Sequence, residues 1–393
     1  MYPKLKDTME LAIVKYIKEH GLAKAIKDFS LKTRVYNRKI LLKYNQLESP
    51  FGNREVEECR GIVLEKDTWK VMCLGLTKFY NSAEGHAAKI DWSTAKIQTK
   101  LDGTCINLYY DWYKDCWFAA TTGTAEGEGE VNNRYDTSFN DLFWETVKNN
   151  YDEVKFMGML DYFKSELPVT LTFELTTPYN IVVTPHSESS ITLLSARYMN
   201  TLGEVDVDML IEFSKQLGVP YVEEHDLNRG NFGHLIKTFE NMPFDNEGYV
   251  VVDGNFNRVK VKNPAYVAAH MLKGKSEFHH IMDIIKTNEV DEYVVTFSER
   301  EDEVRQLADN YQLLINRLEN CWLQLKVVKP KNITKEERKK FASKVFDISE
   351  SSDLKNFTGF FFGMMDGKIE SASSYLRDMD NKKLYGFCKP TNN

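Results

Sequence analysis

The first part of the chain alternates short apolar runs with turn residues, a pattern typical of β-strands. Residues 104–110 (TCINLYY) and 116–122 (CWFAATT) flank a polar stretch and predict an antiparallel hairpin. Residues 247–253 and 258–262 flank Asp253-Gly254 and predict a second hairpin. Further strands are expected over four more apolar runs, at 61–66, 170–175, 180–184 and 191–198.

Helical spacing of apolar residues appears at both ends of this β-rich region. Leu11, Val14 and Ile17 predict an N-terminal helix that breaks or restarts at Gly21. An amphipathic helix is expected over residues 207–218, ending at its glycine, and another is expected to start at Pro264. From about residue 273 helices dominate, with the main ones expected at 299–326, 334–346 and 367–379. The pattern therefore predicts an α+β chain, with antiparallel sheets over 1–272 and an all-α C-terminal domain over 273–393.

Composition narrows the possible functions. The 393 residues are 42% hydrophobic, which is enough for a substantial core, and the formal net charge is −7. An acidic chain is a poor candidate for coating nucleic acid without specificity, so any such site should be a local basic groove. The charged N-terminus and the lack of a long apolar run predict neither a signal peptide nor a membrane span. Six cysteines without zinc spacing favour the reducing cytoplasm.

Two short basic motifs are candidates for chemistry on a phosphate. Lys100 follows a strand-like segment and is followed by Leu101-Asp102-Gly103, so it is a candidate covalent nucleophile, although a polar turn would explain the motif as well. Arg60 precedes Gly61 and a strand, where its guanidinium could bind a phosphate or ribose, or simply face solvent.

Three later groups of residues strengthen this interpretation. Glu174 lies within an apolar strand, where a carboxylate needs a partner or a function unless its face is solvated. Glu247 and Gly248 open another strand. Lys260 and Lys262 share one face of the strand that follows, and two adjacent ammonium groups are best explained by a polyanion lying across them.

In this order the motifs resemble the covalent nucleotidyltransferase superfamily of ligases and mRNA capping enzymes. Within it the chain is most similar to the bacteriophage T4 RNA ligase 1 family. The resemblance covers most of residues 44–270 and rests on ECRGIVLE (58–65), KFYN (78–81), KLDGT (100–104), TFELTTPYNIVV (172–183), NEGYVVV (246–252) and RVKVKNPAYV (258–267). A weaker match at 355–368 is similar to the helical domain of that family, and no OB-like region is evident after Lys262.

The resemblance implies a role for each matched residue. Lys100 would attack the α-phosphorus of ATP and carry AMP. Glu174 would hold the ribose hydroxyls and, with Glu247, would bind Mg²⁺ or Mn²⁺. Lys260 and Lys262 would neutralise the phosphates. The other implied nucleotide-binding residues are Arg60, Lys78, Tyr80, Asp102, Gly103, Gly248 and Tyr266.

The implied activity is that of an ATP-dependent RNA ligase. It would join 3′-hydroxyl and 5′-phosphate ends through an adenylylated RNA 5′ end, with single-stranded ends of broken tRNA as substrate. Residues 1–272 would form the adenylyltransferase domain and residues 273–393 the RNA-recognition domain of a cytoplasmic monomer, and the resemblance is compatible with a virus-encoded protein.

The chain departs from the family pattern at two places, and one of them is the segment after Pro178, which lacks the arginine that can follow the asparagine. Thr122 stands where the family has a lysine or arginine, and this keeps open the alternative of a nucleotide- and RNA-end-binding protein with reduced catalysis. A DNA ligase or a capping enzyme is the other alternative, which the choice of nucleotide and of acceptor would distinguish.

Overall fold

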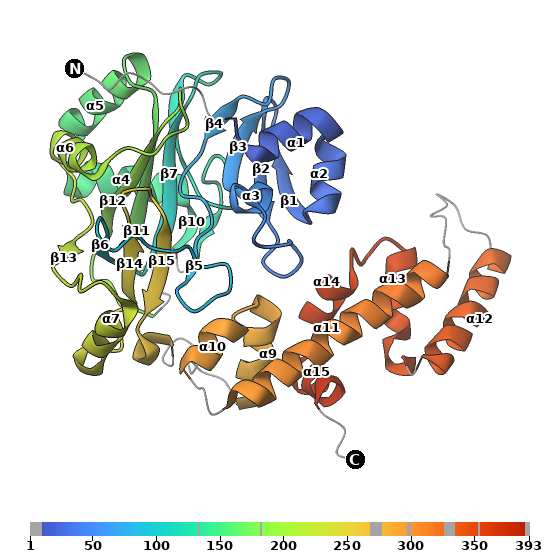
Figure 1. Cartoon of the computed structure of the whole chain (residues 1–393). Helices are drawn as coiled ribbons and strands as arrows, with labels where there is room; N and C mark the ends of the chain where they lie inside the picture. Colours follow the sequence, from blue (N-terminus) through green and yellow to red (C-terminus); the bar gives the residue numbers. More distant parts are fainter. Residues whose placement is uncertain are drawn as a thin grey trace. The chain divides into compact units, whose positions relative to one another are not determined.

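The computed structural model describes residues 10–132, 134–180, 183–267, 277–296, 300–325, 335–352 and 354–389 (Figure 1). The chain forms two compact units, Met1–His270 and Met271–Asn393. The domain boundary expected at 272/273 falls within residues 268–276, outside the described residues.

The N-terminal sheet contains four antiparallel strands in the order in which they follow one another along the chain: β1 (Leu31–Val35), β2 (Lys39–Tyr44), β3 (Arg60–Glu65) and β4 (Val71–Cys73). The nearby helices are α1 (Ala12–His20), α2 (Leu22–Asp28) and the short α3 (Arg54–Glu57). As expected, α1 ends and α2 begins at Gly21, whose φ is 85°. Apolar residues of α1, including Ile13 and Ile17, pack on Ile40 and Leu42 of β2.

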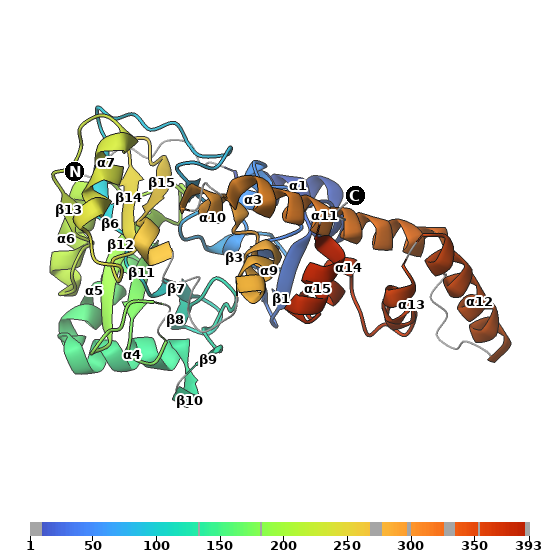
Figure 2. The same ribbon diagram turned by 90° about the horizontal axis from the view of Figure 1, so that it is seen from below.

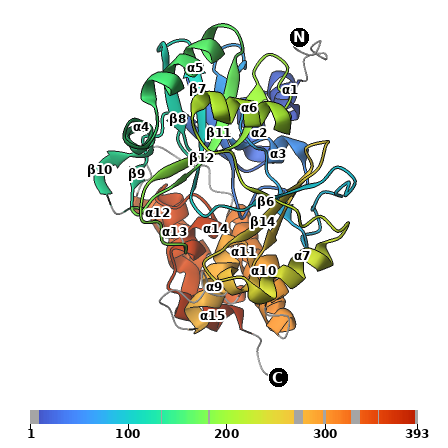
Figure 3. The same cartoon turned by 90° about the vertical axis from the view of Figure 1, so that its left-hand side faces the viewer.

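The central sheet is antiparallel, in the order β12 (Ser190–Tyr198), β11 (Val169–Thr176), β7 (Thr104–Asp111) and β8 (Cys116–Ala120). Three helices pack against this sheet and share a hydrophobic core with it: α4 (Phe139–Asn150), α5 (Glu153–Ser165) and α6 (Val207–Leu217). Figure 3 shows these helices beside the sheet. A small ribbon of β9 (Glu130–Val131) and β10 (Arg134–Ser138) precedes α4. The buried rings of Phe143, Phe156 and Phe173 join the helices to the sheet.

The third sheet, called the pocket sheet here, has the order β13 (Glu224–His225), β6 (Lys96–Thr99), β14 (Gly248–Val252), β15 (Arg258–Lys262) and β5 (Tyr80–Asn81). Its β14–β15 hairpin is antiparallel, with Gly248 opposite Lys262 and Val250 opposite Lys260, whereas β15 pairs with β5 in parallel. Helix α7 (Phe232–Thr238) and the 3₁₀ turn η1 (Phe239–Asn241) pack against it.

Helices are the regular secondary structure of the second unit in its described residues. The helices are α9 (Glu277–Thr287), α10 (Val290–Thr296), α11 (Glu301–Gln324), α12 (Lys335–Ser351), η3 (Lys355–Phe357), α13 (Thr358–Met365), α14 (Ala372–Arg377) and α15 (Asn381–Cys388). Figure 2 shows the long α11, which contacts α9, α10, α14 and α15. None of the described helices combines the length and the apolarity that crossing a bilayer would require.

The α+β class, both hairpins and the glycine end of α6 are confirmed. The prediction of a strand at 180–184 is wrong for the three of these residues that the structure describes. Asn180, Val183 and Thr184 lie in a bend. The amides of Val183 and Thr184 donate to the Asp102 carboxylate, at 2.9 and 2.7 Å, instead of to a neighbouring strand. The helix expected at 367–379 is shorter, since α14 begins only after its capping Ser371.

Candidate active site

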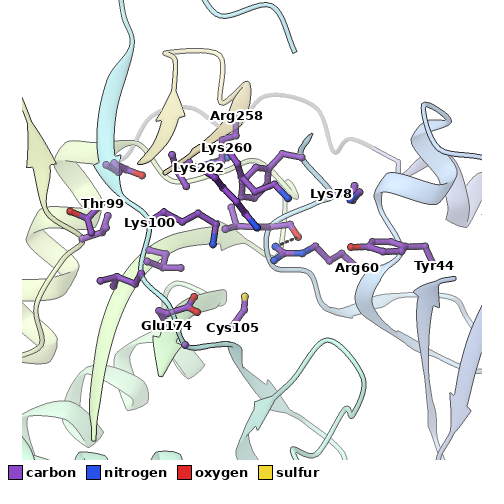
Figure 4. A pocket seen from close by; sticks show the side chains of 18 residues that line it. Tyr44, Arg60, Lys78, Thr99, Lys100, Cys105, Glu174, Arg258, Lys260 and Lys262 are labelled. Atoms are coloured by element: carbon purple, nitrogen blue, oxygen red, sulfur yellow. Dashed lines mark hydrogen bonds between the residues drawn. The ribbon is translucent and has the colours of Figure 1, made fainter. Parts of the chain in front are cut away.

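The first unit contains a pocket of about 290 Å³ to which all three of its large sheets contribute (Figure 4). Its lining includes several basic side chains as well as apolar ones. The lining residues are Tyr44, Arg60, Leu76, Lys78, Phe79, Gln98, Thr99, Lys100, Leu101, Gly103, Cys105, Glu174, Leu194, Val222, Val250, Arg258, Lys260 and Lys262.

Lys100 leaves the end of β6 and points its amine into this pocket (Figure 4). Its backbone amide donates to the carbonyl of Gly248 at 2.9 Å, which continues the pairing of β6 with β14 and holds the start of the loop. Lys100 Nζ lies 2.6 Å from Glu247 Oε1, and Lys262 Nζ lies 3.6 Å from the same oxygen. One buried carboxylate thus pairs with two ammonium groups.

Strand β15 presents three basic side chains to the pocket. Arg258, Lys260 and Lys262 all line it, whereas the intervening Val259 and Val261 are buried on the other face. Arg258 is held by Glu204, with Arg258 Nη1 2.6 Å from Glu204 Oε2. The side chains that alternate along this strand therefore give the pocket a wall suited to a chain of phosphates.

Glu174 enters the pocket from β11, where it stands opposite Cys105 of β7. The pocket withdraws the carboxyl from bulk water, which raises its pKa to about 7, and repulsion from Glu247 adds to this while Lys100 opposes it. Thr172 and Thr176, on the same face of the strand, are buried, so this face is not solvated as the alternative interpretation had it.

Asp102, in the loop that follows Lys100, is buried and does not line the pocket. Burial acts to raise its pKa, but the amides of Thr184 and Val183 and the hydroxyl of Tyr266 hydrogen-bond the carboxylate, and the net effect is a lowered pKa. Tyr266 is itself 3% exposed. Both residues therefore brace the loop that carries Lys100.

Tyr80 is also outside the pocket. Its hydroxyl donates to Glu57 at 2.9 Å and accepts from the amide of Gly52 at 3.1 Å. Lys78 does line the pocket, and its amine lies 5.1 Å from the centre of the Tyr80 ring and 5.0 Å from that of Phe51. Tyr80 therefore acts on the pocket through the position of Lys78.

Two predicted glycines allow close contact between backbone segments. A Cβ on Gly103 would lie 2.5 Å from the carbonyl oxygen of Leu175. Gly248 has a φ of 122°, and a Cβ there would lie 2.3 Å from the carbonyl oxygen of Val261. Both positions exclude a side chain because protein backbone already fills the space.

The structure thus gathers seven of the predicted residues around one pocket, and they are Arg60, Lys78, Lys100, Gly103, Glu174, Lys260 and Lys262. Four others (Asp102, Glu247, Gly248 and Tyr266) are tied to Lys100 or its loop, and Tyr80 is tied to Lys78. Arg258 was missed, although period-2 spacing from Lys260 and Lys262 indicated it. Phe79 lies in the KFYN motif but was not itself predicted as a site residue, and Tyr44 and Thr99 carried no comparable local signal.

The donor set also fits a divalent cation. Among the described residues no group of three or more His, Cys, Asp or Glu side chains could hold a metal ion alone. The pocket instead offers Glu174, and the charge of the nearby Glu247 repels that of Glu174. Mg²⁺ is usually held by one or two carboxylates together with substrate phosphates and water, so this pair fits a cation that arrives with a phosphate ligand.

Comparison with known proteins places this site in a family. Residues 58–266, more than half of the chain, match the model of the T4 RNA ligase 1 family, described as RNA ligase. An RNA ligase of Rhodothermus phage RM378 is 26% identical over 377 residues, covering 79% of this chain and 82% of the phage protein. A candidate bifunctional polynucleotide kinase/RNA ligase of Autographa californica nuclear polyhedrosis virus is 22% identical, covering 76% of this chain and 43% of the viral protein.

A solved archaeal ATP-dependent RNA ligase is 10% identical, with a TM-score of 0.48, and the match covers 92% of this chain and 84% of the archaeal one. The family match spans every motif from Arg60 to Tyr266. The chain belongs to the T4 RNA ligase 1 family of RNA ligases.

Proposed function

We propose that this chain is an ATP-dependent RNA ligase that carries AMP on the side-chain amine of Lys100. The observation that supports this most directly is the position of Lys100. Its amine lies in a pocket lined by the basic side chains of β15, and the carboxylates of Glu174 and Glu247 are nearby. Such a pocket suits a nucleophile and a nucleoside triphosphate together.

In the first step ATP lies with its triphosphate along Lys260 and Lys262. The pocket is also lined by Leu194, Val222 and Val250, which offer apolar contacts for the base. The Lys100 amine attacks the α-phosphorus, a nitrogen–phosphorus bond forms, and the bond to pyrophosphate breaks. The catalytic contribution of the chain is positioning and charge compensation, as is usual for transfer at phosphorus.

The next two steps use the same pocket. An oxygen of an RNA 5′-phosphate attacks the phosphorus of Lys100–AMP, the nitrogen–phosphorus bond breaks, and the RNA end becomes a 5′–5′ pyrophosphate. The 3′-hydroxyl of another end then attacks that end, a phosphodiester bond forms, and AMP leaves. Each step is a displacement at phosphorus, so one set of cations serves all three.

Glu174 and Glu247 would hold Mg²⁺ or Mn²⁺ together with oxygens of the bound phosphates. When bound, the cation supplies positive charge that screens the phosphates. Glu247 has a second task, because it pairs with the Lys100 ammonium and is the nearest group to accept its proton. Glu174 in its ionised form accepts hydrogen bonds from the ribose hydroxyls.

The natural substrate is broken RNA, and cleaved tRNA is the case to test. The second unit, as a separate helical body, would recognise the folded part of that RNA by its shape and backbone. Sealing of nicked tRNA and of short linear RNA should be compared for the full chain and for residues 1–270. The shorter protein should lose the preference for tRNA. If it keeps the same preference, RNA recognition by the second unit is wrong.

The activity itself is tested with a short 5′-phosphorylated RNA, ATP and Mg²⁺. The expected product is a circle or multimer whose phosphate resists phosphatase, and Lys100→Ala should give none. Nicked duplex DNA and GTP are run in parallel. Sealing of DNA or labelling by GTP would favour a DNA ligase or a capping enzyme, and AMP uptake without any sealing would favour the RNA-end-binding alternative that Thr122 keeps open.

A further inference from the structure

Three basic residues stand directly opposite one another on neighbouring strands of the N-terminal sheet. Lys32 of β1 pairs with Lys43 of β2, and Lys43 pairs with Arg60 of β3. Directly opposite residues of antiparallel strands share a face, so the three side chains form one line across the sheet, called the cation row here. Since neighbouring strands lie roughly 4.8 Å apart, the row spans about 10 Å.

The two ends of the cation row lie in different surroundings. At the inner end, Arg60 lines the pocket that contains Lys100. At the outer end, Lys32 is exposed on β1, which is the edge of this sheet. The row therefore connects the pocket with the outside of the first unit.

Lys43, in the middle of the row, lies beside the turn that contains Thr122. The Lys43 amine is 3.9 Å from the position that a Cβ on Gly123 would take. Gly61 adopts a φ of 84° and packs so closely on this turn that a Cβ there would lie 2.7 Å from Cα of Thr122. Thr122 is uncharged at a position where the family has a lysine or arginine, and Lys43 places a positive charge next to it.

Three cations in a line destabilise a sheet unless something compensates them, because like charges directly opposite repel. Burial lowers the pKa of Lys43, and the charges of Lys32 and Arg60 lower it further. Within the described part of the chain, neither Lys32 nor Lys43 makes an ion pair or a side-chain hydrogen bond. Other cations of these strands do, since Arg34 lies 2.9 Å from Glu128 and Lys39 lies 2.5 Å from Asp111.

We propose that the cation row of Lys32, Lys43 and Arg60 binds successive phosphates of the RNA strand whose end enters the pocket. This inference rests on the proposed function, because it supplies the path by which a phosphate-bearing strand reaches Lys100. Lysines bind phosphates as point charges without reading bases, so the path holds RNA of any sequence. The strand is either the one with the 5′-phosphate or the one with the 3′-hydroxyl, since both have the same backbone.

The test is the salt dependence of RNA binding by the full chain without added ATP. Two labelled single-stranded RNAs serve as probes, one with a 5′-phosphate and a blocked 3′ end, the other with a 5′-hydroxyl and a free 3′-hydroxyl. Each phosphate contact on a single strand contributes about 0.7 to the slope of log K against log salt. Lys32→Gln and Lys43→Gln should each reduce the slope by about 0.7 for one or both probes, and Lys43→Arg should restore it.

Lys155→Gln is the matched control, because Lys155 is exposed on α5, outside the cation row and the pocket. The probe that loses slope identifies which strand lies on the row. If Lys32→Gln and Lys43→Gln both keep the parental slope for both probes, the inference is wrong. AMP uptake by the parent is measured separately. A parent that takes up no AMP yet shows the predicted slopes would support the cation row and contradict the ligase mechanism.

Discussion

The side-chain amine of Lys100 and a carboxylate oxygen of Glu247 lie 2.6 Å apart, and Lys262 approaches the same oxygen to 3.6 Å. This ion pair holds the proposed nucleophile in place before ATP binds. An ammonium has no lone pair with which to attack phosphorus, so the pair must open and the proton must leave before AMP can be transferred. Glu247 is therefore both a positioning group and the nearest proton acceptor.

Replacing Glu247 with glutamine should slow AMP uptake by about 100-fold or more, which is the usual scale for loss of a general base. The amide keeps the shape of the side chain but neither attracts the Lys100 ammonium nor accepts its proton. The measurement is the rate of a single round of AMP transfer, followed by intact mass after mixing with ATP and Mg²⁺. Glu223→Gln is the control, since that carboxylate is 72% exposed and lies 3.9 Å from His225, away from Lys100 and Glu247 in the ion pairs that it makes. An undiminished rate in Glu247→Gln would contradict this role.

Glu174 should make the stability of the first unit depend on pH. Its pKa is raised from 4.5 to about 7 in the folded chain, so its ionised form is disfavoured on folding. The loss of folding stability caused by ionised Glu174 is absent below about pH 4.5, grows as pH rises, and is complete above about pH 7. Glu174→Gln should therefore raise the free energy of unfolding by about 1 to 3 kcal/mol at pH 8 and change it little at pH 4.5.

Urea unfolding of both proteins at the two pH values measures this difference. AMP uptake in the same variant should fall, since an amide is a weaker acceptor for ribose hydroxyls. A variant that is equally destabilised at both pH values would show that the shape of Glu174, and not its charge, is what matters for stability.

Lys39 joins the N-terminal sheet to the central sheet through a buried network. Its amine lies 2.5 Å from Asp111, 3.1 Å from Glu126 and 2.9 Å from the hydroxyl of Tyr109. Lys39→Met should cost about 3 to 5 kcal/mol, because it leaves Asp111 as a buried charge without its cation. Urea unfolding measures the loss. Lys39→Met combined with Asp111→Asn should recover part of it, because the amide removes the charge and keeps the oxygen that accepts from the backbone amides of Tyr113 and Lys114. A double variant no more stable than the single one would argue against the charge explanation.

Much of the site could be predicted because alternation along strands is a local property. The sequence RVKVK alone places Lys260 and Lys262 on one face, and the structure puts both in the pocket. The same alternation pointed to Arg258. In the hairpin at 104–122, the polar stretch between two apolar runs was sufficient evidence for the turn.

What the sequence could not reveal has long-range causes. The apolar run at 180–184 favours a strand locally, but the carboxylate of Asp102, far away in sequence, binds the amides of Val183 and Thr184. The pairing of Lys43 with Arg60 depends on the register of β2 with β3 and on the irregularity at Gly61, neither of which a single strand reveals. Glu174 likewise faces a pocket, and not solvent, only because other sheets cover that face.

The central claim is that Lys100 becomes covalently bound to AMP. The direct measurement is the intact mass of the protein after incubation with ATP and Mg²⁺, beside Lys100→Ala and Lys100→Arg, the second of which keeps the charge next to Glu247. The account predicts a gain of one AMP in the parent and in neither variant. If the parent gains no AMP, after AMP carried over from purification has been removed, or if Lys100→Ala gains it too, Lys100 is not the nucleophile and the proposed mechanism is wrong.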